Sequence, residues 1–563
     1  MSATVDSSRS TSGTMHRLSK GTLLASCFAV AVAQIGLSIP AVLNGSIQLD
    51  LNTTSTQLTW VSDAFLVPVT LFELTFGVLG DLFGRKRLLA IGGALVAVGM
   101  VLVFFTPTSG SHSTQLLFLF GGQALGGLGA AAIFPTSVAM LAAGTHSVKE
   151  RSKSISIWAA SLTAGGFISP LMAGLLFELP HSGGEHASWR WGFLALAILG
   201  AISMLITLAF ASNSASPFGR SLDIPGQITV AVGLFALVFG VIQGAEGDWT
   251  SPLVLGSFAL AVIFLAAFVV IERRTTHPLV QLDLFANRVF VVTAVVTILT
   301  MFAYLGTAYA TSIRLSAIQG YSPLMTAIGF VCLNIMGVVL FPFSSQLLQR
   351  YNPGWVLAGG AALIAIGDLW IAAVPATHIS IAAIAIPLLI VGSGFKLAVT
   401  SITAVSVNSV PTDKAGMASG MTSMLRDFGL TMGPAIVGAI ALTHAANEIS
   451  AKVAASPALT KALAAFNAAP AHVPAEQREA VEGAVHAVNS GPIGANGVPA
   501  TVTLPNGQTQ PFNPLKDTAF HALSNAYAIG FLVCGIAALV AAVIAGVLLG
   551  GRPHYHRFVE QDS

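Results

Sequence analysis

Long apolar runs, separated by short breaks that contain polar residues, glycine or proline, make up most of this chain. The run LLAIGGALVAVGMVLVFFT (88–106) carries no charge, and about 20 such residues are enough for one helix to cross a bilayer. Segments of this kind recur near 21–43, 58–80, 88–106, 114–142, 152–178, 191–211, 226–244, 251–271, 290–313, 323–345, 355–375, 379–406, 415–442 and 523–550. A soluble helical protein needs charge on the outward face of nearly every helix. The pattern therefore predicts an all-α polytopic membrane protein with fourteen transmembrane helices.

Composition and charge agree with this prediction. Hydrophobic residues make up 54% of the chain and charged residues 9%, and the mean hydropathy is +0.80. Most lysines and arginines fall in the N-terminal tail, in alternate short loops and in the C-terminal tail, namely at Arg9, Arg17, Lys20, Arg85, Lys86, Arg87, Lys149, Arg151, Lys153, Arg220, Arg273, Arg274, Arg288, Arg350, Lys414, Arg552 and Arg557. By the positive-inside rule this side is cytoplasmic, so we expect a multi-pass protein of the cell (inner) membrane with both termini in the cytoplasm. The net charge of +2 then reflects topology, and we expect no nucleic-acid partner.

Several other chemistries have no signal in the sequence. Cys27, Cys332 and Cys534 all lie inside apolar segments, which indicates neither a disulfide framework nor a metal site. No stretch resembles a Walker loop, so we expect no nucleotide as the energy source. The first twenty residues are polar and the apolar run after them is long enough to span, so we expect no cleaved signal peptide.

A charge cluster interrupts the apolar pattern at GVLGDLFGRKR (77–87), between the second and third predicted spans. Its charged residues are Asp81, Arg85, Lys86 and Arg87. The cations alone would anchor a turn at the headgroup level. The turn also has Gly84, which permits a sharp reversal, and Gly77, which lets helix backbones approach closely. Asp81 could pair with a guanidinium or with a helix N-terminus in one conformation only, so both an anchor and a conformational latch remain open.

GVLGDLFGRKR is similar to the signature between spans 2 and 3 of the major facilitator superfamily, and fourteen spans resemble its drug:proton antiporter branch. Other similar stretches are TWVSDAFLV (59–67), KERSKSISIW (149–158), ISPLMAG (168–174), SWRWGF (188–193) and LDIPGQ (222–227). The resemblance covers nearly the whole chain. It implies the major facilitator fold, in which two six-helix bundles rock around a cavity at the membrane midplane.

The resemblance also implies a division of the chain. The expected parts are a tail at 1–20, an N-terminal bundle at 21–211, two extra spans with their linkers at 212–289, a C-terminal bundle at 290–550 interrupted by an extracytoplasmic loop at 443–522, and a tail at 551–563. The loop contains alanine-rich helical patterns near 446–468 and 474–488 and a hairpin signal at Asn506-Gly507. It could be a flexible linker or a small cap over the outer mouth.

The fifth predicted span carries the antiporter signature of the branch. Gly166, Pro170 and Gly174 put small residues and a kink on one helix, so that a neighbouring helix can pack closely along it. Ser169 and Ala173 stand where the signature usually has glycine.

Three further positions, outside span 5, depart from the branch. Its members usually have an acidic residue in span 1 and an arginine in span 4, and the corresponding positions are Ala31 and Gln123. The absence of both the acid and the arginine is consistent, because either one alone would leave an unpaired charge in low dielectric. The expected second loop signature, LLQRYNPGW (347–355), keeps Arg350 but has Gln349 in the place of an acid.

Few charges remain inside the predicted spans, and each costs roughly 2.5–3.5 kcal/mol at the bilayer centre on insertion scales. They are Asp63, Glu73, Asp368, Lys396, Arg426 and Asp427, with Arg314 at the outer end of span 9. We expect Asp63 to bind the coupling proton or a cationic substrate, followed by Asp427 and then Glu73. Lys396 and Arg426 are candidate charge partners of Asp427, and such pairs could be purely structural. Gln34, Trp60 and Gln123 are expected to line the cavity.

Three functions fit these features to different degrees. The signature in span 5 favours a secondary active exporter of drugs or of a natural product, with proton antiport and no other cofactor. Its partners would be small hydrophobic, cationic substrates and the lipid bilayer, and we expect it to work as a monomer. An uptake transporter or symporter on the same fold is the alternative, because span 1 lacks its acid. A polytopic enzyme or sensor would need a cluster of His, Asp or Ser at one membrane face, which the sequence does not show.

Overall fold

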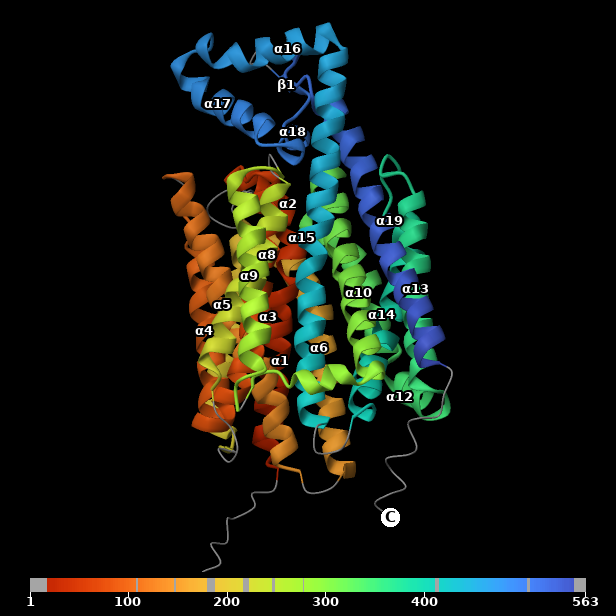
Figure 1. Cartoon of the computed structure of the whole chain (residues 1–563). Helices are drawn as coiled ribbons and strands as arrows, with labels where there is room; N and C mark the ends of the chain where they lie inside the picture. The colour runs from red at the N-terminus through yellow and green to blue at the C-terminus, as the bar shows by residue number, and fades with distance from the viewer. Residues whose placement is uncertain are drawn as a thin grey trace, which may run out of the picture.

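The computed structural model shows a bundle of long helices with a smaller helical layer at one end (Figure 1). It describes residues 18–107, 110–145, 148–179, 188–215, 222–245, 249–276, 278–410, 415–503 and 507–550. Within these ranges, 13 helices are long and apolar enough to cross a membrane, or up to 14 if the bent pair α11 and α12 forms one span. The all-α polytopic architecture is therefore confirmed, whereas nearly all of the predicted tails lies outside the described residues.

Two sets of helices build the bundle. The N-terminal half consists of α1 (Lys20–Ser38), α2 (Pro40–Leu51), α3 (Ser55–Phe83), α4 (Arg85–Phe104), α5 (His112–Ala143), α6 (Val148–Phe177) and α7 (Arg190–Phe210). The C-terminal half consists of η2 (Leu282–Ala286), α10 (Arg288–Ser312), η3 (Ile313–Ile318), α11 (Pro323–Val339), α12 (Phe341–Arg350), α13 (Pro353–Ala373), α14 (Ala382–Asn408), α15 (Ala415–Ala455) and α19 (Lys516–Leu549). The halves meet where α6 contacts α11 and where α3 contacts α15.

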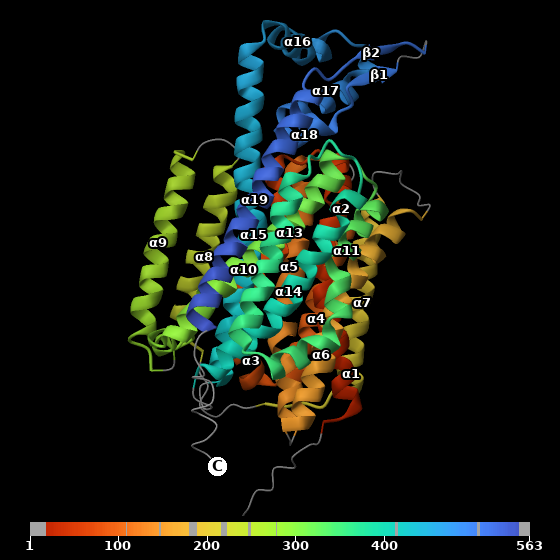
Figure 2. The ribbon, with the colours of Figure 1, turned by 90° about the vertical axis from the view of Figure 1, so that its right-hand side faces the viewer.

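Two further helices stand at the side of the bundle (Figure 2). They are α8 (Ile224–Gly244) and α9 (Pro252–Glu272). Helix α8 packs against α3 and α15, so it touches both halves, and α9 packs against α8. Most of the apolar surface of α9 is exposed, as expected for a helix that faces lipid.

Two predicted spans are broken in the structure. The segment predicted at 21–43 is divided where α1 ends and α2 begins at Pro40, because proline has no N–H to continue the helical hydrogen bonds. The segment predicted at 323–345 is divided into α11 and α12, whose axes differ by 44° at Leu340, two residues before Pro342. Hydropathy alone cannot show these breaks, because the residues around them remain apolar.

The segment between α15 and α19 forms a folded cap. It contains α16 (Pro457–Ala468), η5 (Ala469–Ala471), α17 (Ala475–Asn489), α18 (Pro492–Gly497) and the antiparallel strands β1 (Thr501–Thr503) and β2 (Thr509–Pro511). Buried Phe466, Val488 and Leu515 belong to a small apolar core of its own. The strands form the hairpin that the sequence predicts, with Gly507 at a φ of +79°, while Asn506 lies outside the described residues.

The boundary between membrane and cap differs from the prediction. Helix α15 was expected to end near 442 but continues to Ala455, and its 41 residues exceed what a bilayer needs. The next residue is Ser456, whose side chain accepts a hydrogen bond from the N–H of Leu459 and so caps α16. The alanine-rich pattern predicted as one helix near 446–468 is therefore two helices with a corner between them (Figure 1).

Helices α4 and α5 of the N-terminal half approach closely at glycine. A Cβ atom built on Gly122 of α5 would lie 2.5 Å from the carbonyl oxygen of Gly99 on α4, and one on Gly99 would lie 2.5 Å from the carbonyl oxygen of Gly122. A side chain at either position would push α4 and α5 apart. Small residues allow this contact where lipid provides no hydrophobic driving force between helices.

Uncharged hydrogen bonds join the two halves at the end that carries the cap. The Asn44 amide donates to Ser312 Oγ at 3.2 Å, and Thr59 Oγ1 lies 2.8 Å from the Tyr309 hydroxyl. Helix α18 adds contacts to both halves. The N–H of Ile493 donates to Ser55 Oγ at 3.3 Å, and the Asn496 amide donates to the carbonyl of Ala317 at 2.7 Å. The bundle is closed at this end.

The closed end predicts a specific cross-link. A Cβ atom built on Gly45 of α2 lies 2.8 Å from Ser316 Cβ of η3, so two cysteines there need to separate by only about 1 Å to reach disulfide geometry. In a background without the native cysteines, Gly45→Cys with Ser316→Cys should lose both free thiols on mild oxidation. Gly45→Cys with Ser456→Cys is the control that should keep them. A double variant that stays reduced would contradict this closure.

Candidate functional site: a cavity between the two halves

Two cavities lie between the N-terminal and C-terminal halves. The central cavity, of about 150 Å³, is lined by α1, α2, α5 and α6 on one side and by α10, α11, α14 and α15 on the other. The larger one, of about 450 Å³, lies toward the turn between α3 and α4. Phe134 and Arg426 line both, so the two spaces are neighbours along the axis of the bundle. With the cap end closed, the approach to the central cavity is from the end that carries Arg85.

A cluster of three ionisable groups separates the two cavities. Arg426 Nε lies 2.8 Å from Asp427 Oδ1, and one terminal nitrogen lies 3.3 Å from Asp427 Oδ2 and 4.0 Å from Glu73 Oε1. Asp427 faces the central cavity and Glu73 the larger one. Because Glu73 is on α3 and the other two are on α15, the cluster bridges the two halves. Thr70 strengthens this bridge, since its hydroxyl donates to the backbone carbonyl of Asp427 at 3.1 Å.

Lys396 is a second cation of the central cavity. Its exposed fraction is 7%, and its Nζ lies 4.6 Å from the centre of the Phe341 ring. Within the described ranges no carboxylate oxygen lies within 4.0 Å of it. The structural pair of Lys396 with Asp427 that the sequence left open is therefore not formed, and Asp427 is paired with Arg426 instead.

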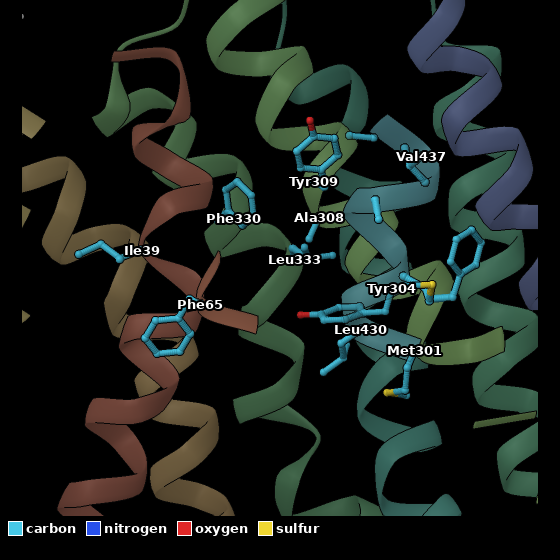
Figure 3. Close-up of a cluster of buried hydrophobic side chains, with 14 of the residues drawn as sticks. Ile39, Phe65, Met301, Tyr304, Ala308, Tyr309, Phe330, Leu333, Leu430 and Val437 are labelled. Atoms are coloured by element: carbon cyan, nitrogen blue, oxygen red, sulfur yellow. The ribbon is translucent and has the colours of Figure 1, made fainter. Parts of the chain in front are cut away.

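Aromatic and amide groups line the C-terminal wall of the central cavity. The rings of Tyr304 and Phe395 are stacked, with centroids 3.5 Å apart and planes 9° from parallel. The Tyr304 hydroxyl donates to Asn334 Oδ1 at 3.3 Å, and the Asn334 amide donates to the carbonyl of Phe330 at 2.9 Å. In Figure 3 the Tyr304 hydroxyl points away from its own helix, to the side of the view on which Ile39 and Phe65 are labelled.

These wall residues were missed by sequence reasoning. An aromatic side chain in an apolar span has no distinctive signal. Asn334 could have been noticed, because an amide inside a span must find hydrogen-bond partners.

Asp63 is enclosed in this conformation. It is 0% exposed, and neither carboxylate oxygen has a hydrogen-bond partner among the described residues. It lies one turn after Thr59, which contacts Tyr309 at the closed end. Water from the cap end therefore does not reach Asp63 in this conformation.

Two of the three expected lining residues lie elsewhere. Gln34 lines the central cavity. Trp60 packs against Phe235 and Phe239 of α8, with ring centroids 6.3 and 6.1 Å away, so it supports the side helices. Gln123 is fully buried and donates to the carbonyl of Val61 on α3 at 3.2 Å. A polar residue in a span can thus hydrogen-bond to a neighbouring helix instead of lining a cavity.

The signature residues of α6 lie in two different surroundings, the central cavity and a contact with α11. Gly166 lines the central cavity, whereas a Cβ on Gly174 would lie 2.8 Å from the Cα of Leu324 on α11. Pro170 lies between them within the helix, and the hydroxyl of Ser169 donates to the carbonyl of Ile35 on α1 at 2.9 Å. Helix α6 therefore packs against its own half and against the other half.

The charged turn between α3 and α4 is held within the N-terminal half. Asp81 Oδ1 accepts from Arg85 at 2.7 Å, and the N–H of Arg85 donates to the carbonyl of Ser214 at 2.9 Å. Gly84 has a φ of +100°, a left-handed conformation that glycine adopts without strain. Gly77, Asp81 and Arg85 line the larger cavity, while Arg87 is exposed.

One expectation for this turn is wrong. A Cβ on Gly77 would be 3.6 Å from Pro135, which is ordinary contact. The close approach occurs at Gly80, where a Cβ would be 2.8 Å from Thr136 Cγ2.

Other buried charges have structural partners. Arg190 donates to Asp50 Oδ2 at 2.7 Å, which fixes the start of α7 beside the end of α2. Arg314 donates to backbone carbonyls at the end of α13, where the helix dipole is negative. Asp368 accepts from the hydroxyl of Thr307 at 2.6 Å and is fully buried. None of these four lines either of the two cavities described above.

Comparison with known proteins gives consistent results. The family model of the Major Facilitator Superfamily matches residues 24–434. The Multidrug resistance protein Stp of Mycobacterium tuberculosis is 30% identical over 427 residues, 76% of this chain and 76% of that protein. The Tetracenomycin C resistance and export protein of Streptomyces glaucescens is 25% identical over 525 residues, 93% of this chain and 90% of that protein.

A solved structure shares the fold. It is that of a bacterial homolog to the human lysosomal transporter Spinster, with a TM-score of 0.58 and 14% identity over 94% of this chain and 98% of that chain. With two helical halves around a central cavity, the matched family model and a relative at 30% identity, this chain belongs to the major facilitator superfamily.

Proposed function

We propose that this protein is a secondary active exporter of small hydrophobic molecules that works by alternating access. The observation that carries this proposal is the central cavity, which lies between two halves that are joined at one end and separated at the other. Rocking of the halves would move a bound molecule from one side of the membrane to the other. Relatives named for multidrug resistance and for tetracenomycin C resistance and export support transport out of the cell.

The protein would load its substrate from the cytoplasm. In the sequence, most lysines and arginines fall on the same predicted side as the turn between α3 and α4, toward which the larger cavity lies. The positive-inside rule assigns that side to the cytoplasm together with both termini. The cap would then lie outside the cell or in the periplasm. Binding the substrate from the cytoplasmic end and opening the cap end produces export. An uptake symporter would use the same cavity in the opposite direction, so direction must be measured.

Protons are the proposed coupling ion, with no other cofactor. In the cluster of Glu73, Arg426 and Asp427, one guanidinium serves two carboxylates that lie on different halves. Protonation of Glu73 would remove its attraction to Arg426 and weaken one link between α3 and α15. Asp63 is the second candidate, because its buried carboxylate has no hydrogen-bond partner among the described residues. These groups give the exporter two places to hold a proton.

The topology can be tested by cysteine labelling. A cysteine at Ser490 at the end of α17, in a background without native cysteines, should react with a membrane-impermeant maleimide in intact cells. A cysteine at Tyr351, which is 61% exposed at the opposite end, should react only in inside-out vesicles. The reverse pattern would invert the proposed direction of loading.

Proton coupling can be tested with inside-out vesicles to which a fluorescent dye is added from outside. An imposed pH gradient should drive dye accumulation, and an uncoupler should abolish it. The variants to assay are Asp63→Asn, Glu73→Gln and Asp427→Asn. At least one of them should lose coupling, with a gradient-driven rate about tenfold lower, because a titrating group has been removed. Asp368→Asn is the matched control, because Asp368 lies away from the cavities. If all three variants remain coupled, other residues carry the proton or the protein is not a proton antiporter.

The turn between α3 and α4 should affect the balance between conformations. Asp81→Asn removes the charge that holds Arg85 at the wall of the larger cavity, between the two halves, so the initial transport rate should fall about tenfold, a shift of about 1.4 kcal/mol, while membrane insertion is unchanged. Arg87→Gln is the control, because Arg87 is exposed in this structure. A normal rate in Asp81→Asn would reduce the motif to a topological anchor.

A further inference from the structure

We propose that the central cavity selects planar aromatic molecules that carry an acidic group, with Lys396 as the counter-charge. This inference rests on the proposed export function and assigns the substrate class of the same cavity. It differs from the sequence-based expectation of cationic substrates. Three features of the cavity carry it: an uncompensated cation, a flat aromatic wall, and an opposite wall without ionisable groups.

The first feature is the charge of Lys396. Arg426, the other cation of the cavity, already binds both oxygens of Asp427. Lys396 is more than nine-tenths buried, and within the described ranges it has an aromatic ring but no carboxylate beside it. A buried cation without an anion is unfavourable in low dielectric. An acidic ligand would supply the missing anion, whereas a cationic ligand would meet a like charge.

The second feature is the stack of Tyr304 and Phe395. Phe395 directly precedes Lys396 on α14, so the ring and the cation belong to the same part of the wall. Aromatic rings attract other flat rings in offset-stacked or edge-to-face arrangements, so this wall favours planar aromatic ligands. The Tyr304 hydroxyl is committed to Asn334, which fixes the ring plane in the absence of ligand. A cavity of about 150 Å³ matches the volume in which an apolar protein site holds a single benzene ring, and the larger cavity adjoins it.

The third feature is the neutral wall contributed by the N-terminal half. Its polar residues at the central cavity are Gln34, Ser38 and Thr163, which can donate hydrogen bonds but carry no charge. Ala31 and Gln123 stand where related antiporters have an acid and an arginine, so the first and fourth predicted spans also add no charge nearby. The charged residues that line the central cavity are Lys396, Arg426 and Asp427, whereas Glu73 lines the larger cavity. Within the central cavity the net charge is therefore positive.

The test uses three naphthalene compounds that differ in charge at the end of a short chain. Naphthaleneacetate is anionic, naphthaleneethanol is neutral and naphthaleneethylamine is cationic. Binding to the purified full-length protein is measured by naphthalene fluorescence, and gradient-driven movement is measured in proteoliposomes. The wild type should bind the acid at least tenfold more tightly than the amine. Lys396→Gln should weaken binding of the acid about tenfold and leave the alcohol nearly unchanged, which also shows that the variant is folded.

Two more variants sharpen the interpretation. Lys396→Arg keeps the charge and should keep the preference for the acid. Lys452→Gln, which removes an exposed lysine of the C-terminal end of α15, should change nothing. Phe395→Leu should weaken the binding of all three compounds by a similar factor, because it removes the flat aromatic surface but no charge.

Failures of the two proposals are distinguishable. If the alcohol or the amine moves with the gradient but the acid binds no better than the amine, the export function stands and the acidic preference is wrong. If Lys396→Gln binds the acid as tightly as the wild type does, Lys396 is not the counter-charge. If none of the three compounds binds, the assigned substrate class is wrong. If compounds bind but no gradient moves any of them, the proposed export function is wrong.

Discussion

The cost of burying charge in a low-dielectric interior is the constraint on which this architecture depends. For Arg426 this cost is offset by Asp427 and Glu73, and the contact with Glu73 joins α15 to α3. For Arg314 the cost is offset by hydrogen bonds to backbone carbonyls at the end of α13. Each buried charge thus either ties helices together or needs a partner from outside the protein. Lys396 belongs to the second case.

Closure at the cap end relies on a different kind of contact. The hydrogen bonds between Asn44 and Ser312, and between Thr59 and Tyr309, join neutral groups. Each neutral hydrogen bond contributes only about 0.5–1.5 kcal/mol net, so a few of them can hold two halves together and still separate. Helix α18 adds contacts to both halves, which makes the cap part of the closed end. Opening at this end must therefore move α18 relative to at least one half.

Sequence patterns predicted the helices well where hydropathy was the deciding property, and less well at their ends. The break at Pro40 and the bend at Leu340 lie within apolar stretches, so only backbone geometry reveals them. The extension of α15 to Ala455 lies in an alanine-rich segment, where helix propensity is high and hydropathy carries no boundary. The hairpin was predictable because its signal is local.

The sequence by itself determined the fold class, the family and the short list of intramembrane charges, because hydrophobic length, loop signatures and the cost of buried charge all act locally along the chain. Only the tertiary structure decided which of those charges meet. Glu73 and Arg426 are more than 350 positions apart, so no local pattern could pair them. The same holds for Trp60, which faces α8, and for Tyr304, which faces the cavity. The direction of a side chain depends on how helices pack around it, and that packing is a property of the whole bundle.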